Sequence, residues 1–256
     1  MKIVVCVKHV PDSGAYISLV GKTGYDEAVK CVANPFDEYG LEQAIRVVQE
    51  QGTGEVVVVT VGKESAETTL RAALSLGAHR AILVVTDTLF LDSGVTSRAL
   101  QKAIELDGKP DLVFTGKQAI DTEGAQTPYR LAAAMNMPVA TNVVGFRLTD
   151  GKAVVEREIE DGSREVIEMT LPCVVGATKG LNEPRYPKLT DLIKARKKEI
   201  KRMAIRELGV ESSGTGAELL ELEKPPERKK ARMLSGDARE MAGELVRLLR
   251  EEAKVL

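Results

Sequence analysis

Short runs of branched apolar residues alternate with longer segments of helical periodicity through the first half of the chain. The apolar runs are continuous, as in strands that are buried on both faces, and they lie at residues 3–7, 55–61, 81–85 and 112–115. Apolar positions recur at helical spacing in the segments between and after them, at residues 37–49, 64–76, 96–106 and 128–137. Repeated strand–helix–strand units predict an α/β fold with a doubly wound, mostly parallel sheet.

Two helix ends carry recognisable signals. Asn34-Pro35-Phe36-Asp37 predicts a turn, because Pro35 disfavours helical backbone at Asn34. We expect Asp37 to cap the helix that then runs to Gln49. At the other end of the next helix, Gly77 predicts a left-handed cap.

The pattern changes after Pro138, where apolar and polar residues alternate. Three antiparallel strands are expected at residues 143–148, 153–158 and 165–170. Asp150-Gly151 and Asp161-Gly162 are the turn signals between them. These strands predict a small antiparallel extension. The segment 171–176 that follows is again a mostly apolar run, like those in the first half of the chain.

The C-terminal segment has few residues that could form a core. Chain breaks are expected at Ser212–Gly216 and Pro225-Pro226, and Lys229-Lys230 are charged. Only residues 237–254 read as an amphipathic helix. Such a segment is either disordered or lies on a partner. We therefore expect one α/β domain over residues 1–205 and an extended C-terminal arm over residues 206–256.

Composition narrows the function classes. Lysine and arginine number 36 against 38 aspartate and glutamate, so the charge gives no case for nucleic acid binding. Three scattered cysteines indicate a reducing compartment rather than a disulfide framework, and two histidines make a metal cluster implausible. No apolar run reaches the roughly 18 residues of a membrane span, and the first is too short for a signal peptide. We expect a soluble, cytoplasmic protein.

The segment Gly116–Thr127 is the strongest candidate for chemistry. It is a small, polar loop that joins a strand to a helix, where free N–H groups and the helix dipole favour a phosphate. It matches neither the GxGxxG nor the Walker pattern. A strand-to-helix turn without a ligand is the alternative, since every α/β domain has such turns.

Other strand ends should line the same crevice. They lie near Cys6–Lys8 and Thr60–Gly62, and Asn34–Asp37 could reach the crevice from a neighbouring loop. For Cys6, a small core residue is the stronger interpretation. No pair of nucleophile and base is evident, and His9 and His79 lie far apart in the sequence. The pattern therefore weighs against a hydrolytic or group-transfer enzyme.

Two further segments each allow two interpretations. Leu181–Pro187 could be a turn that tucks Leu181 into its own core, or a loop that presents an apolar anchor to a partner beside Arg185. The basic run Lys194–Lys198 could bind an anion or nucleic acid, but such a run is more often a solvated helix face.

Taken together, these motifs resemble the β subunit of electron transfer flavoprotein, a family that includes the FixA proteins. The resemblance spans nearly the whole chain. Its motifs are Val4–Asp12, Asn34–Glu38, Leu41–Ala44, Ala72–Ala78, Gly116–Asp121, Leu181–Tyr186 and a signature from Val155 to Val175. The signature departs from the family pattern at Gly176, where alanine, threonine or cysteine is usual.

The resemblance implies an adenine-nucleotide α-hydrolase-like fold and a heterodimer with an α subunit that carries most contacts to a redox-active FAD. This chain would hold AMP or a second FAD in its own pocket. The residues carried over for that nucleotide are Cys6, Asn34, Pro35, Phe36, Asp37, Val61, Gly116, Ala119, Asp121, Thr122, Gly124, Ala125, Gln126 and Thr127. The residues carried over for partner docking are Leu181, Asn182, Glu183, Pro184, Arg185 and Tyr186, with Leu181 as the anchor.

The function implied is that of an electron carrier subunit without catalytic residues of its own. It would pass electrons from acyl-CoA dehydrogenase-type flavoproteins of fatty acid β-oxidation to a quinone oxidoreductase, with no membrane insertion. The C-terminal arm would contact the α subunit. Two alternatives stay open, namely the β subunit of an electron-bifurcating complex that binds a second FAD and oxidises NADH, and a stand-alone nucleotide-binding protein of the stress type.

The subtype signals conflict. Ala125 replaces the asparagine that helps to hold the AMP phosphate in simple carriers. The Ala125-Gln126 pair and Val10–Ser13 resemble the bifurcating type, but the Val-Gly-Pro that follows the pair in that type is absent here. Leu181-Asn182-Glu183 resembles the simple type.

Overall fold

The computed structural model describes residues 1–210, 216–226 and 231–256. The expected chain break at Ser212–Thr215 and the charged pair Lys229-Lys230 lie outside these residues. The chain divides into two compact units, Met1–Leu222 and Glu223–Leu256, which are described separately. The first unit therefore continues past residue 205, where we expected the domain to end.

A nine-stranded sheet forms the centre of the first unit, in the order β11-β10-β9-β12-β8-β1-β6-β7-β13. Its strands are β1 (Lys2–Cys6), β6 (Glu55–Gly62), β7 (Arg80–Val85), β8 (Leu112–Gly116), β9 (Val139–Thr149), β10 (Lys152–Glu158), β11 (Arg164–Thr170), β12 (Cys173–Ala177) and β13 (Ile200–Ala204). The strands from β12 to β13 pair in parallel. The mostly parallel sheet expected from the apolar runs is confirmed.

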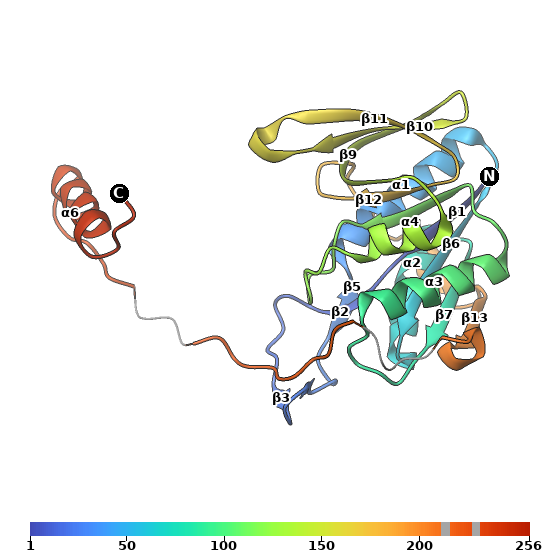
Figure 1. Cartoon of the computed structure of the whole chain (residues 1–256), viewed down its shortest axis with the longest axis horizontal. Helices are drawn as coiled ribbons and strands as arrows, with labels where there is room; N and C mark the ends of the chain where they lie inside the picture. Colours follow the sequence, from blue (N-terminus) through green and yellow to red (C-terminus); the bar gives the residue numbers. More distant parts are fainter. Residues whose placement is uncertain (211–215, 227–230) are drawn as a thin grey trace. The chain divides into compact units, whose positions relative to one another are not determined.

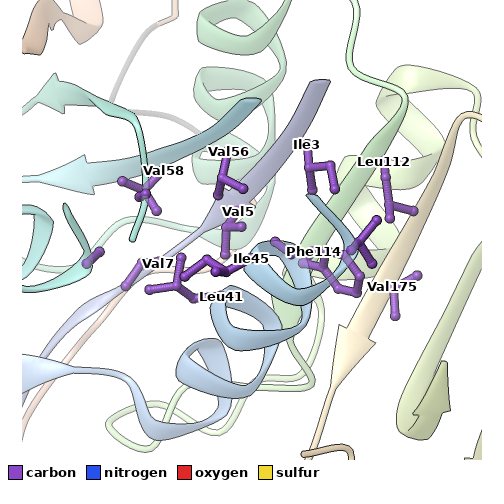
Figure 2. Close-up of a cluster of buried hydrophobic side chains, with 14 of the residues drawn as sticks. Ile3, Val5, Val7, Leu41, Ile45, Val56, Val58, Leu112, Phe114 and Val175 are labelled. Carbon is purple, nitrogen blue, oxygen red and sulfur yellow. The ribbon is translucent and has the colours of Figure 1, made fainter. Parts of the chain in front are cut away.

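Helices cover both faces of this sheet (Figure 1). They are α1 (Pro35–Gln51), α2 (Glu67–Leu76), α3 (Ser93–Asp107), α4 (Thr127–Met135) and α5 (Leu189–Ala195), and short 3₁₀ turns lie at η1 (Glu64–Ala66), η2 (Glu160–Gly162) and η3 (Ile205–Leu208). In the parallel strands, alternate residues belong to two separate cores, one against α1 and α2 and the other against α3 and α4. Figure 2 shows the first core, where Leu41 and Ile45 of α1 lie against Val5 of β1 and Val7, which follows that strand. Two covered faces are the hallmark of a doubly wound fold.

The antiparallel extension belongs to the same sheet. The start of β9 pairs in parallel with β12, through Val139 and Ala140. The rest of β9 pairs with β10 in antiparallel fashion, from Val143 to Thr149. The strand is longer than the expected 143–148 because its first residues complete the parallel part of the sheet. Asp150-Gly151 and Asp161-Gly162 have positive φ values, as the expected hairpin turns require.

One sheet strand was missed in the sequence. Within the basic segment Lys194–Arg202, α5 ends at Ala195 and β13 begins at Ile200. Ile200 and Met203 are buried, whereas Lys201 and Arg202 are exposed. Charged side chains are common on edge strands because they block pairing with other chains. In β13, Lys201 and Arg202 interrupt the apolar pattern, and the strand is too short to be recognised from its sequence.

Residues 9–33 form two small antiparallel pairs that the sequence did not predict. β2 (His9–Pro11) pairs with β5 (Cys31–Ala33), and β3 (Leu19–Val20) pairs with β4 (Gly24–Tyr25). Strands of two or three residues are below the length at which alternation can be read.

Two expected helix caps need correction. α1 begins at Pro35 rather than after Asp37, and proline suits that first position because its missing N–H would have no helical partner. Asp37 lies inside the first turn and caps nothing. Gly77 ends α2 with φ 134°, a positive value that lies outside the compact left-handed helical conformation we expected.

The second unit contains α6 (Ala238–Glu251), which confirms the expected amphipathic helix. Asp237 accepts hydrogen bonds from the N–H groups of Arg239 and Glu240 at 2.8 and 2.9 Å, and Glu240 accepts one from the N–H of Asp237. No residue of α6 is buried. Among the described residues, no helix is both long and apolar enough to cross a bilayer.

Candidate functional site

A cleft of about 860 Å³ lies at the carboxyl ends of β1, β6, β7 and β8. From β1 the chain proceeds outward through β6 and β7, then returns to the other side of β1 to form β8. The β1–β8 junction is therefore a topological switch point, where the loops diverge and leave a crevice. This is the position at which α/β proteins bind ligands.

Two buried polar side chains fix the rim of this cleft. Asp37 accepts hydrogen bonds from the N–H of Lys8 at 2.7 Å and the N–H of Gly116 at 2.8 Å, which join the ends of β1 and β8. Asn34 donates to the carbonyl of Gln118 at 2.9 Å and accepts from the N–H of Ile120 at 3.1 Å. The start of α1 therefore holds the loop that follows β8.

Asp37 is buried, and burial raises its pKa to about 7. The hydrogen bonds from Lys8, Asn34 and Gly116 act in the opposite direction, because they favour the charged form. Glycine is required at position 116. A Cβ there would overlap the Asp37 carboxylate and would lie 2.7 Å from Phe36 Cβ.

The loop 117–126 is exposed at its tip and has an unusual backbone. Glu123 and Ala125 adopt φ values of 48° and 50°, which non-glycine residues rarely occupy. Such strain is concentrated at binding sites and persists only where the surroundings enforce it. Lys8 Nζ anchors the tip through an ion pair with the Asp121 carboxylate at 2.7 Å.

The N-termini of α3 and α4 meet at Gln126. The Gln126 side-chain oxygen accepts hydrogen bonds from Ser93 Oγ at 3.1 Å and from Arg130 Nε at 2.9 Å. Asp92 caps α3 through the N–H of Gly94. Gln126 provides no such side-chain cap for α4, so the first turn of α4 can offer N–H groups to an anion beside the Arg130 guanidinium.

The floor of the cleft is buried and carries two hydroxyls without partners. Thr60 Oγ1 and Thr115 Oγ1 are inaccessible and make no hydrogen bond within the described structure. Cys6 lies between the two strands that carry them. Burial, aided by the nearby Asp37, raises the pKa of the Cys6 thiol far above its usual range. Burial therefore favours the neutral thiol of Cys6 in the wall of the cleft. All three cysteines are free.

The structure brings most of the predicted nucleotide residues to this one cleft. Those that line it are Cys6, Asn34, Asp37, Val61, Gly116, Ala119, Asp121, Thr122, Gly124, Ala125, Gln126 and Thr127. Pro35 and Phe36 are outside the described lining. Pro35 is exposed, and Lys117 Nζ lies 5.1 Å from the centroid of the Phe36 ring.

The lining segments that were missed in the sequence include the following three. The loop after β7 contributes residues 88–93, the small strands contribute Tyr25 to Cys31, and Gly216 and Ala217 complete the wall. The carboxyl end of β7 could have been included by the reasoning that found the other strand ends. The other two segments have no local signal, because only the tertiary fold brings them to the cleft.

The predicted docking loop is fastened to α1. Glu42 accepts hydrogen bonds from Arg185 Nε at 2.7 Å and from Arg46 Nε at 2.6 Å. Burial alone would raise the pKa of Glu42, but these arginines outweigh it and hold the pKa below its usual range. Asn182 donates to the carbonyl of Tyr39 at 3.0 Å. Glu183 is exposed, and its carbonyl accepts from Arg46, while Pro184 is half-buried.

The docking role of Leu181 stays a prediction, and its burial is what the structure describes. Leu181 is half-buried and packs against the first core, which supports the interpretation of a tucked leucine. The exposed apolar side chains follow it in sequence. Tyr186 is 94% exposed, and Leu189 and Ile193 of α5 are 74% and 56% exposed.

Comparison with known proteins places this architecture in a family. The electron transfer flavoprotein domain model matches residues 23–208. Over its whole length the chain is 35% identical to the electron transfer flavoprotein subunit beta of Bacillus subtilis and 37% identical to the mitochondrial one of Arabidopsis thaliana, and all of both relatives is covered. It is also 36% identical to CarD of the caffeyl-CoA reductase–Etf complex of Acetobacterium woodii, over 98% of this chain and 99% of that one. The chain belongs to the β-subunit family of electron transfer flavoproteins.

Proposed function

We propose that this chain is the β subunit of a simple electron carrier. It pairs with an α subunit that holds most of a redox-active FAD, accepts electrons from an acyl-CoA dehydrogenase-type flavoprotein and passes them to a quinone oxidoreductase. The cofactor performs the redox chemistry, and this chain supplies position, electrostatics and docking. The three free thiols support a reducing, cytoplasmic location.

The observation that carries this proposal is the cleft at the switch point. Its residues fit a nucleotide, because the uncapped start of α4, Gln126 and Arg130 suit a phosphate, while the buried apolar floor suits a base. We propose that AMP is held there in a structural role. Arg130 offers a positive charge near the position where Ala125 lacks the side-chain donor of an asparagine.

One observation favours a second candidate, the bifurcating subunit. The cleft extends from the α4 end of the site to Tyr25 and Cys31, and its 860 Å³ lies near the upper end of the usual range for ligand pockets. A second FAD would use this room, and in that case the complex would oxidise NADH.

Counting the cofactors of the purified complex tests the proposal. One FAD and one AMP per heterodimer are expected for the simple carrier. Two FAD, no AMP and rapid reduction by NADH would overturn it in favour of the bifurcating candidate.

We also propose that α6 contacts the α subunit and that the exposed residues Tyr186, Leu189 and Ile193 contact the partner dehydrogenase. α6 has apolar residues on one stripe and buries none of them within its own unit. Apolar side chains with high exposure, within the loop 181–187 and in α5 just after it, suit a partner that docks and leaves.

A further inference from the structure

Helix α5 has an exposed apolar face that its own packing does little to hold in place. Leu189, Leu192 and Ile193 are exposed, and among the seven residues of this helix Ala195 alone is buried. A helix of this length is not stable by itself in water. Its position must therefore depend on contacts made by other parts of the chain.

A hollow of about 660 Å³ lies between α5, α1 and the end of α2. Its lining includes Asp191 and Lys194 of α5, Arg46 of α1 and Leu74 of α2. The side chains of Asp191 and Lys194 therefore face open space rather than a packed core. The hollow leaves α5 without apolar packing on this side.

Polar contacts hold the chain before and after α5. Before it, Arg185 Nε donates a hydrogen bond to the Glu42 carboxylate on α1. After it, Arg71 of α2 donates from Nη1 to the carbonyls of Ala195 and Lys198 at 2.9 and 2.8 Å. The last carbonyls of a helix have no partner within the helix, so a cation from α2 can satisfy them.

The end of α2 receives the reverse contact from Lys198. The Lys198 ammonium donates to the carbonyls of Leu74 and Ala78 at 2.9 and 2.5 Å. The last turn of α2 has no basic residue of its own. Arg71 and Lys198 therefore each satisfy carbonyls at the end of the other's segment, and together they fasten the end of α5 to α2.

The Arg71 guanidinium is itself oriented from within α2. Glu67 lies one turn earlier and accepts a hydrogen bond from Arg71 Nε at 3.0 Å. This leaves Nη1 directed to the carbonyls of Ala195 and Lys198. A planar guanidinium with several fixed donors suits such a task better than a lysine ammonium does.

We propose that Arg71 is a positioning residue for the docking of the partner dehydrogenase. This inference rests on the proposed docking role of Tyr186, Leu189 and Ile193. Arg71 acts through the backbone of α5 and fixes the direction in which Leu189 and Ile193 are presented. Without it, α5 occupies the docking orientation for a smaller fraction of the time, and the apparent affinity for the partner falls by the same factor.

The experiment uses the co-purified heterodimer, with an acyl-CoA dehydrogenase of the same organism as the electron donor and its acyl-CoA as the reductant. Arg71→Gln should raise the KM for the heterodimer about fivefold or more and leave kcat unchanged, because the docked complex contains the same cofactors. Arg71→Lys should give an intermediate KM, since one donor remains.

Arg206→Gln is the control for charge. Arg206 is exposed in η3, and its replacement removes the same positive charge from the same unit. Its KM should stay within about twofold of the wild-type value, because exposed charges interact weakly over a distance.

Hydrogen exchange of the heterodimer gives an independent readout. Arg71→Gln should speed the exchange of the amides of residues 192–198, while the cofactor content stays the same and the unfolding temperature stays within about 4 °C of wild type. An arginine with a purely structural role would not give a raised KM together with unchanged stability. If Arg71→Gln does not fold, Lys198→Gln takes its place, because it removes the reverse contact and should raise the KM as well.

Leu189→Ala separates the two levels of the proposal, because it removes an apolar contact directly. An unchanged KM in Leu189→Ala would refute the proposed docking surface. A raised KM in Leu189→Ala without one in Arg71→Gln, or an equal rise in Arg206→Gln, would overturn the positioning role of Arg71 alone.

Discussion

Single residues at the rim of the cleft have structural roles that their sequence context does not reveal. Asp37 reads as a helix cap but joins the ends of β1 and β8 through two backbone N–H groups. Asn34 reads as a turn residue but holds the loop after β8 with both its donor and its acceptor. At this scale, the buried side chains of Asp37 and Asn34 provide hydrogen-bond partners for backbone groups at the strand ends and in the loop after β8.

Gly116→Ala tests this rim. The new methyl group would collide with the Asp37 carboxylate and Phe36, so we expect a loss of about 1–3 kcal/mol in unfolding free energy and weaker nucleotide binding. Gly124→Ala, in the same loop, is the control, because a Cβ at Gly124 meets nothing within 4 Å. Urea denaturation of both variants makes the comparison. Equal stability of the two variants would show that the rim is not tightly packed.

At the scale of elements, α1 holds the loop that contains Leu181, whereas α5 exposes its apolar residues. The ion pairs of Glu42 with Arg46 and Arg185 hold the loop 181–187 on α1, and this keeps Leu181 against the core. The chain then turns outward into α5, where apolar residues are exposed. The loop 181–187 is therefore held in place by α1, whereas the apolar side chains of α5 that follow it are exposed.

Leu189→Ala should slow electron transfer from a partner dehydrogenase and change stability by less than about 0.5 kcal/mol, because Leu189 is exposed. Leu181→Ala is the contrasting variant. It should cost about 2 kcal/mol in unfolding free energy, because its side chain packs on the core. Stopped-flow reduction kinetics and urea denaturation measure the two effects. A rate loss in Leu181→Ala alone would return the anchor role to Leu181.

On the scale of the whole molecule, the two units differ in how they are stabilised. Met1–Leu222 has two cores, one on each side of a nine-stranded sheet. Glu223–Leu256 has a well-capped helix but no buried residue in it. We therefore propose that a partner buries the apolar stripe of this helix, which includes Met241, Leu245 and Leu248.

A chain that ends at Leu222 should keep the unfolding temperature of the first unit. Its affinity for the α subunit should fall about tenfold or more, since even one buried leucine contributes about 1.5–3 kcal/mol. Analytical ultracentrifugation with the co-purified α subunit measures this affinity, and calorimetry measures the unfolding. Undiminished affinity would exclude α6 from the interface.

The sequence by itself determined the elements that depend on local periodicity. Continuous apolar runs predicted the buried strands, hairpin signals predicted the extension, and the polar loop 116–127 predicted one wall of the cleft, because these features depend on neighbours along the chain. β13 was not predictable, since two basic residues in its five interrupt the apolar pattern and its place is set by pairing with β7.

Only the tertiary structure decided what the site is made of. Tyr25, Phe90 and Gly216 reach the cleft from distant segments, and the Thr115 hydroxyl is buried without a partner within the described structure. Burial and hydrogen-bond satisfaction are properties of the packed molecule. Periodicity can place Thr115 near the end of a strand, but it cannot show that its hydroxyl has no partner among the described residues.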